Sequence, residues 1–164
     1  MSAGERVFVG LGANLGDARA TLEAAVQGLA ALPQTQLLQL SPVYRSAPVD
    51  AEGPDFLNAV AELRCTLEPE ALLAHLHALE LQHGRERPYA NAPRTLDLDL
   101  LLFGTRVVRT SALESALTLP HPRMHLRAFV LLPLLELAPG LHHPLLGDLA
   151  PWVQAAADQP VARI

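Results

Sequence analysis

The stretch APRTLDLDLLLFG (residues 92–104) predicts a β-strand in which two acidic residues interrupt a run of leucine. Successive side chains of a strand point to opposite faces, so Asp97 and Asp99 share one face, with about 6.5–7 Å between their Cα atoms. Leu96, Leu98 and Leu100 share the other face, which we expect to lie against the core. This strand therefore has one apolar face and one face with paired negative charge.

The chain before this strand predicts five further elements. Asp17 can cap a helix, Pro69 fits the first turn of another, and GANLGD predicts a turn after the first strand. Periodicity and turn residues place the elements at 6–11 (strand), 17–32 (helix), 35–49 (strand), 55–65 (strand) and 66–86 (helix). The two middle strands pair as an antiparallel hairpin, because the link between them is too short for a crossover.

The element order is β-α-β-β-α-β, which predicts an α+β fold with a ferredoxin-like core and an antiparallel sheet. After it we expect a short C-terminal hairpin at about 106–109, a helix at 128–138 and a final helix near 149–157. No repeat, low-complexity tract or linker divides the sequence, so residues 1–164 are expected to form a single domain.

Composition narrows the functional classes. A single cysteine, Cys65, and the absence of a signal-peptide pattern fit the cytoplasm, and no apolar stretch reaches the roughly 20 residues that span a bilayer. The net charge of −5 does not favour nucleic acid, so neither nucleic acid nor membrane is an expected partner. All 12 basic residues are arginine, so any bound phosphate must be held by arginine, histidine or backbone N–H groups.

Two carboxylates on one strand face repel each other unless positive charge lies between them. Two Mg²⁺ ions bound by Asp97 and Asp99 and by phosphate oxygens would remove that repulsion. A solvated outer face of an amphipathic strand is the alternative. Arginines and histidines flank the pair at 85, 87, 94, 121, 123, 125 and 127, which indicates a site for metal-bound polyphosphate or, alternatively, a surface ion-pair network.

Two other motifs, a glycine-rich stretch and a pair of histidines, give only weak indications of a binding site. GLGANLG follows a strand and precedes a helix, but its spacing is G-x-G-x-x-x-G and the chain is short for a dinucleotide enzyme, so we place these glycines in a turn beside the substrate pocket. His121 and His125 have the i, i+4 spacing of some zinc ligands, yet Pro120 and Pro122 argue against a helix there and no third ligand is evident.

Six blocks of the sequence together resemble the 6-hydroxymethyl-7,8-dihydropterin pyrophosphokinases of folate biosynthesis. In chain order they are VGLGANLGD, SPVYRSAPV, GPDFLNAVAEL, ALELQHGRER, PRTLDLDLLLFG and LTLPHPRMHLRAFVLLPL. The resemblance implies transfer of pyrophosphate from ATP to the hydroxymethyl group of a reduced pterin, with release of AMP. It also implies in-line attack by the pterin hydroxyl on the β-phosphorus, under a loop at 83–93 that closes over ATP.

The resemblance assigns roles residue by residue. Catalytic roles fall to Asp97, Asp99, Arg85 and Arg94, with Asp97 and Asp99 holding two Mg²⁺. ATP is bound by Glu80, Arg87, Leu100, Thr118, His121 and Arg127. The pterin is bound by Ser46, Ala47, Val49, Phe56, Asn58 and Phe129, with the two aromatic rings on its faces and the amide on its polar edge.

A ferredoxin-like module that binds a nucleotide without turnover is the non-enzyme alternative. For the enzyme, the expected partners are the small-molecule substrates ATP and the reduced pterin. A monomer is expected, with docking to the next folate-pathway enzyme as a further hypothesis.

Overall fold

The computed structural model describes residues 4–14, 17–47, 55–83, 96–109 and 117–164. The elements of the predicted core are β1 (Glu5–Ala13), α1 (Ala18–Ala30), β2 (Thr35–Leu40), β3 (Tyr44–Ser46), β4 (Phe56–Cys65), α2 (Pro69–Gln82) and β5 (Leu96–Phe103). After them come β6 (Val108–Arg109), β7 (Thr118–Leu119), a 3₁₀ turn η1 (Met124–Leu126), α3 (Ala128–Leu137), β8 (His142–His143), β9 (Gly147–Asp148), α4 (Ala150–Ala155) and β10 (Val161–Arg163). The fold combines helices with an antiparallel sheet, as the sequence predicts.

The main sheet has the strand order β10-β3-β4-β1-β5, with β2 also paired to β4. Every neighbouring pair in it is antiparallel. Strand β1 is central because it pairs with β4 along one side and with β5 along the other. This position places the strand with the two aspartates next to the strand with Gly10 and Gly12.

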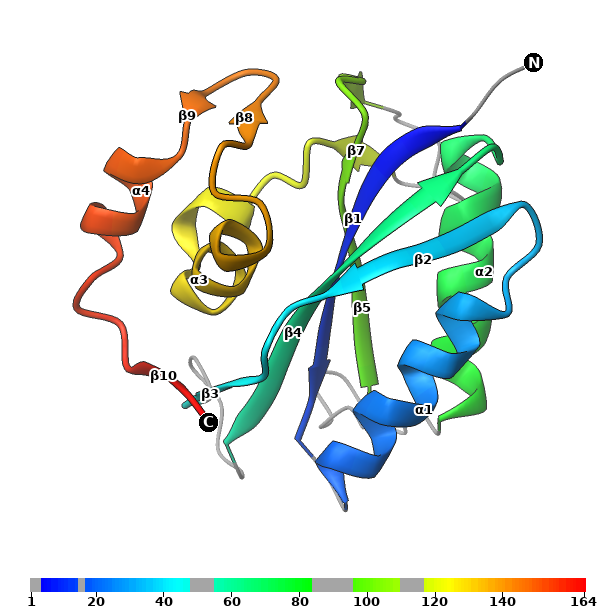
Figure 1. The fold of residues 1–164 in the computed structure, drawn as a ribbon, viewed down its shortest axis with the longest axis horizontal. Helices are drawn as coiled ribbons and strands as arrows, with labels where there is room; N and C mark the ends of the chain where they lie inside the picture. The colour runs from blue at the N-terminus through cyan, green and yellow to red at the C-terminus, as the bar shows by residue number, and fades with distance from the viewer. Residues whose placement is uncertain (1–3, 15–16, 48–54, 84–95, 110–116) are drawn as a thin grey trace.

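Each face of the sheet is covered by helices, and two apolar clusters result (Figure 1). Helices α1 and α2 cover one face, where Leu96, Leu98 and Leu100 are buried as predicted. Helix α3 covers the other face, where it packs with Phe8, Val60 and Leu101. Asp17 caps α1, since its carboxylate accepts a hydrogen bond from Ala20 N at 3.0 Å.

Three sequence predictions need correction. Strand β1 continues to Ala13, so Gly10 and Gly12 lie inside a strand, not in a turn. The predicted strand at 35–49 is broken at residues 41–43, where Pro42 lacks the N–H that a ladder needs. The hairpin expected at 106–109 is formed instead by β6 and β7, which pair Val108 with Leu119.

The C-terminal region contains three short strands that periodicity does not reveal. Strands β8 and β9 pair with each other, and β10 returns to the main sheet beside β3. In Figure 1 the end of the chain accordingly lies next to β3. Across the described ranges, no helix has the length and apolar character needed to cross a membrane.

Candidate active site

A row of paired residues crosses the middle of the sheet. Gly12 on β1 is paired with Asn58 on β4 and with Asp97 on β5. One step along the strands, Gly10 is paired with Val60 and Asp99 in the same way. Directly paired residues project from the same face, so Asn58 and the two aspartates share a face, and Asn58 lies about 10 Å from Asp97 across two strand spacings. The glycines between them have no side chain, and the floor is bare at Gly12, whereas the Leu101 side chain lies 3.5 Å from the place where a Cβ atom of Gly10 would stand.

Phe56 borders the same floor. A Cβ atom placed on Gly12 would stand 3.5 Å from Asn58 Oδ1 and 3.8 Å from Phe56 Cδ1. Phe56 and Asn58 are two positions apart on β4, and the alternation of side chains puts them on one face, as predicted. An aromatic ring and an amide thus border one small space above Gly12.

The amide of Asn58 is fixed from the neighbouring strand. Its Nδ2 donates a hydrogen bond to Ser46 Oγ at 2.7 Å, and both side chains are buried. Ser46 is paired with Phe56 across β3 and β4, so the three predicted pterin residues Ser46, Phe56 and Asn58 lie together. Ala47 follows directly after β3 and is exposed, and Val49 lies outside the described residues.

A cleft of about 290 Å³ opens beside the aspartates, between α2, β5 and residues 117–122. It is lined by six of the predicted site residues: Glu80, Asp97, Asp99, Leu100, Thr118 and His121. Leu73 and His77 of α2 also line it. Leu100 is buried in the core on its strand's apolar face, so it contributes an apolar wall to the cleft.

Glu80 reaches the cleft from α2. Its carboxylate accepts a hydrogen bond from Leu98 N at 2.9 Å, and the residue is buried. Strand β5 is the edge of the main sheet, so an outward N–H of this strand needs a partner from another element. Glu80 therefore holds the backbone between the two aspartates, a role that the sequence does not predict.

His121 and Arg127 both lie near Asp99. His121 Nε2 is 4.0 Å from Asp99 Oδ1, and Arg127 Nη1 is 4.0 Å from Asp99 Oδ2. Burial, reinforced by the positive charge of Arg127, lowers the pKa of His121 to about 4. The imidazole is thus neutral at pH 7 and forms no ion pair with Asp99. Its Nδ1 accepts a hydrogen bond from Arg123 N at 3.1 Å, which assigns the proton to Nε2, on the side of Asp99.

Arg127 connects the cleft to the first turn of α3. Its guanidinium carbon lies 5.5 Å from the centre of the Phe129 ring, within the range of a cation–π contact. Phe129 is half-buried and packs against the second apolar cluster. One arginine thus contacts both the predicted metal site, through Asp99, and a predicted pterin residue.

The chemistry of the donors fits magnesium. Asp97 and Asp99 supply hard carboxylate oxygens on one wall of an open cleft. The described residues contain no group of three or more His, Cys, Asp or Glu side chains arranged to hold a metal. Mg²⁺ usually takes one or two carboxylates plus water and substrate phosphates, so a pair of aspartates suits an ion that arrives with a nucleotide.

The structure does not support the zinc site or the dinucleotide-binding site that the sequence offers as alternatives. His121 lines the cleft, whereas His125 packs edge-on against Trp152 with 4.7 Å between ring centres, so the two do not form a zinc pair. Gly10 and Gly12 lie within β1, which removes the turn that a dinucleotide fingerprint requires. Arg85, Arg87 and Arg94, together with the loop expected to close over ATP, lie outside the described residues.

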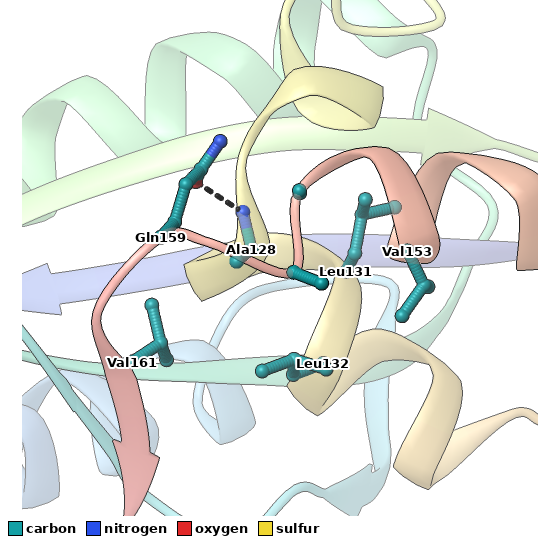
Figure 2. A pocket seen from close by; sticks show the side chains of 8 residues that line it. Ala128, Leu131, Leu132, Val153, Gln159 and Val161 are labelled. Carbon is teal, nitrogen blue, oxygen red and sulfur yellow. Dashed lines mark hydrogen bonds between the residues drawn. The ribbon is translucent and has the colours of Figure 1, made fainter.

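Another cavity, of about 250 Å³, lies between α3, α4 and β10 (Figure 2). Its lining is apolar apart from Gln159, whose Oε1 accepts from Ala128 N at 2.9 Å and whose Nε2 donates to Leu126 O at 2.8 Å. Both amide atoms are already engaged, and no charged group lines the cavity. The cleft beside the aspartates is therefore the better candidate for catalysis.

Comparison with known proteins gives one consistent family. The family model described as 7,8-dihydro-6-hydroxymethylpterin-pyrophosphokinase (HPPK) matches residues 8–139. A 2-amino-4-hydroxy-6-hydroxymethyldihydropteridine pyrophosphokinase of Pseudomonas aeruginosa is 45% identical over 141 residues, covering 85% of each chain. The protein of the same name from Haemophilus influenzae is 35% identical over 158 residues, covering 96% of each chain.

Solved structures support the same fold. An HPPK-DHPS crystal structure in complex with substrates aligns with 94% of this chain at a TM-score of 0.75 and 11% identity. The Plasmodium falciparum HPPK-DHPS A437G structure aligns with 92% of this chain at a TM-score of 0.71 and 14% identity. The present chain spans only 43% and 45% of those two chains, respectively.

Proposed function

Because the chain belongs to the 7,8-dihydro-6-hydroxymethylpterin-pyrophosphokinase family, we propose that it transfers pyrophosphate from ATP to the hydroxymethyl group of 6-hydroxymethyl-7,8-dihydropterin. The products are AMP and the pterin diphosphate, a step of folate biosynthesis. The observation that carries this proposal is the row Asn58–Gly12–Asp97, which puts an amide beside an aromatic ring and an acidic pair on one bare face. Two substrates of different chemistry can meet there.

The pterin end of the row suits a flat, polar-edged ring. Phe56 offers an aromatic face, and the buried amide of Asn58, held by Ser46, reads donors and acceptors on the ring edge. Phe129, Ala47 and Val49 complete the proposed pterin set. The bare floor at Gly12 lets the ring lie close to the sheet, with its hydroxymethyl group directed toward the aspartates.

The acidic end suits the triphosphate. Asp97 and Asp99 would hold two Mg²⁺ ions, which supply positive charge to the phosphate oxygens. Arg127 adds a fixed positive charge, and His121 offers an uncharged Nε2–H donor. Glu80, Leu100 and Thr118 would contact the nucleoside, while Arg85, Arg87 and Arg94 would hold phosphates. The pterin oxygen then attacks the β-phosphorus, the bond to the α-phosphate oxygen breaks, and AMP leaves as the hydroxyl proton is released.

We also propose that the 164 residues form one domain with a ferredoxin-like core. One support is the order of the strands in the sheet: the hairpin of β2/β3 and β4 lies beside β1, and β5 lies on the other side of β1, while the elements follow one another in the chain as β-α-β-β-α-β. A second support is β10, which joins the C-terminal region to the same sheet. A cytoplasmic monomer is the state we expect. Docking with the next folate-pathway enzyme is favoured by the solved HPPK-DHPS chains, in which an HPPK is part of a longer protein.

The test is an incubation with Mg-ATP and 6-hydroxymethyl-7,8-dihydropterin, followed by separation of the nucleotides. One AMP for each pterin diphosphate, and none when the pterin is omitted, supports the pyrophosphokinase. ADP would indicate transfer of a single phosphoryl group. Binding of ATP without turnover would indicate the non-catalytic module instead.

A further inference from the structure

Strand β3 carries a key part of the proposed pterin site but is only three residues long. It pairs with β4 on one side and with β10 on the other, so its backbone is held by two neighbours. So short a strand contributes few ladder hydrogen bonds of its own, and its position depends on side-chain contacts. Ser46 at its end holds Asn58, so a shift of β3 moves the amide that reads the pterin.

Tyr44 lies at the other end of β3. It is paired with Asn58, it is two positions from Ser46, and only 8% of it is exposed. Its hydroxyl donates a hydrogen bond to the carboxylate of Glu136. A phenol that donates to a carboxylate makes a charge-assisted bond, about twice as strong as a neutral one. Burial and this hydrogen bond raise the pKa of Tyr44 to about 12.

Glu136 belongs to α3, the helix that carries Phe129 near its start. The two are seven positions apart, which is close to two turns, so both lie on one helix face about 10 Å apart. Helix α3 contacts both β3 and β4. The bond from Tyr44 to Glu136 therefore joins the strand that holds Asn58 to the helix that holds Phe129.

Glu136 has a second partner on β10. Arg163 Nη1 lies 3.0 Å from Glu136 Oε2, but 61% of the arginine side chain is exposed. Exposed ion pairs contribute little, so this contact orients the carboxylate while the buried phenol supplies most of the connection.

We propose that Tyr44 and Glu136 are a positioning pair for the pterin, which sets the separation between the Asn58 amide and the Phe129 ring. The inference rests on the proposed function, because it assumes that Asn58 and Phe129 bind the pterin. Neither Tyr44 nor Glu136 needs to touch the substrate. A site that binds a flat ring depends on the exact positions of the groups that contact the ring, since small displacements of these groups weaken binding and lower the rate together.

The experiment compares Tyr44→Phe, Glu136→Ala and Glu136→Gln with the unaltered protein. Calorimetry measures the Kd of 6-hydroxymethyl-7,8-dihydropterin in the presence of a non-hydrolysable ATP analogue, and the Kd of that analogue alone. Tyr44→Phe and Glu136→Ala should each weaken pterin binding about threefold to tenfold and change nucleotide binding less than twofold. Glu136→Gln should retain most of the affinity, because an amide oxygen still accepts from the phenol.

A double variant makes the test specific. Tyr44→Phe with Glu136→Ala should weaken pterin binding no more than either change alone, because both remove the same hydrogen bond. Arg106→Ala serves as the control, since it breaks a surface ion pair with Glu5 and should leave both affinities unchanged. Circular dichroism at the assay temperature confirms folding, and the partly exposed Glu136 gives a variant that tolerates truncation.

The results separate the two proposals. AMP formation by the unaltered protein, with the same pterin Kd in all variants, overturns the positioning pair and leaves the function intact. Equal weakening of pterin and nucleotide also overturns it, because a general structural role predicts that pattern. No pterin binding by the unaltered protein overturns both proposals. Selective weakening without AMP formation supports the pair and overturns the reaction.

Discussion

Asn58 and Asp97 face the same side of the sheet because each is paired directly with Gly12 on strand β1. The amide proposed to read a pterin and the carboxylate proposed to hold a metal are thus fixed to one rigid strand. No loop lies between them, so their separation is set by sheet geometry, at about 10 Å. A hydroxyl acceptor and a phosphate donor can be brought together on such a floor without large backbone motion.

The bare floor gives the first prediction. Gly12→Ala should weaken pterin binding at least about tenfold and leave nucleotide binding unchanged, because its methyl group would occupy the space beside Phe56 and Asn58. The fold should persist, since the added Cβ meets its neighbours at 3.5 Å or more. Calorimetric titration with each ligand measures both effects. Gly140→Ala, which meets nothing within 4 Å, is the control, and equal pterin affinity in the two variants would contradict the prediction.

The aspartates give the second prediction. Asp97→Asn should lower kcat by about a thousandfold, because the amide removes a negative oxygen ligand while keeping the shape of the side chain. Thermal unfolding should change little, since Asp97 is half-exposed at the cleft. Asp158→Asn, an exposed change in the C-terminal region, should leave kcat unchanged. A steady-state assay of AMP release decides, and a kcat within a factor of ten of the unaltered protein would refute the metal assignment.

The sequence predicts the shared face of Asp97 and Asp99, and that of Phe56 and Asn58, because strand alternation is a local property. It also predicts the β-α-β-β-α-β order and the cap at Asp17. It cannot predict that Asn58 and Asp97 meet across Gly12, because the register between strands depends on pairing over more than 40 residues of chain. The sequence predicts a turn for the glycines of GLGANLG, whereas Gly10 and Gly12 lie within β1, and the missing side chain at Gly12 leaves open the space beside Phe56 and Asn58.

Sequence patterns also do not predict contacts between side chains that are far apart in the sequence. Glu80 bonds to Leu98 N, and Tyr44 bonds to a residue 92 positions away, and neither contact leaves a periodic signal. Strand β10 is too short and too polar at its end to stand out from a terminal coil. By contrast, Glu80, Thr118 and His121, to which the resemblance assigns ATP binding, all line one cleft.

Tyr44 gives a prediction for alkaline pH. Its folded pKa of about 12 is above the ordinary tyrosine value of 10.0, so the folded state binds more protons than the unfolded state between these values. Stability should therefore fall as pH rises from 10 to 12, by about 1–2 kcal/mol. Because the chain contains no lysine, few other side chains titrate between pH 10 and pH 12. Urea unfolding of the unaltered protein and Tyr44→Phe measures it, and parallel pH profiles would contradict the assignment.

Gln159, in the C-terminal segment, accepts a hydrogen bond from Ala128 N at the start of α3 (Figure 2), and this contact gives the last prediction. Gln159→Ala removes its bonds to Ala128 N and Leu126 O and should lower the free energy of unfolding by about 1–3 kcal/mol. Gln159→Glu should lie between, since a carboxylate accepts from Ala128 N but cannot donate to Leu126 O. Chemical denaturation measures both, with the exposed Gln154→Ala as control. If Gln159→Ala is as stable as the control, the two hydrogen bonds of Gln159 do not stabilise the start of α3, which contradicts the prediction.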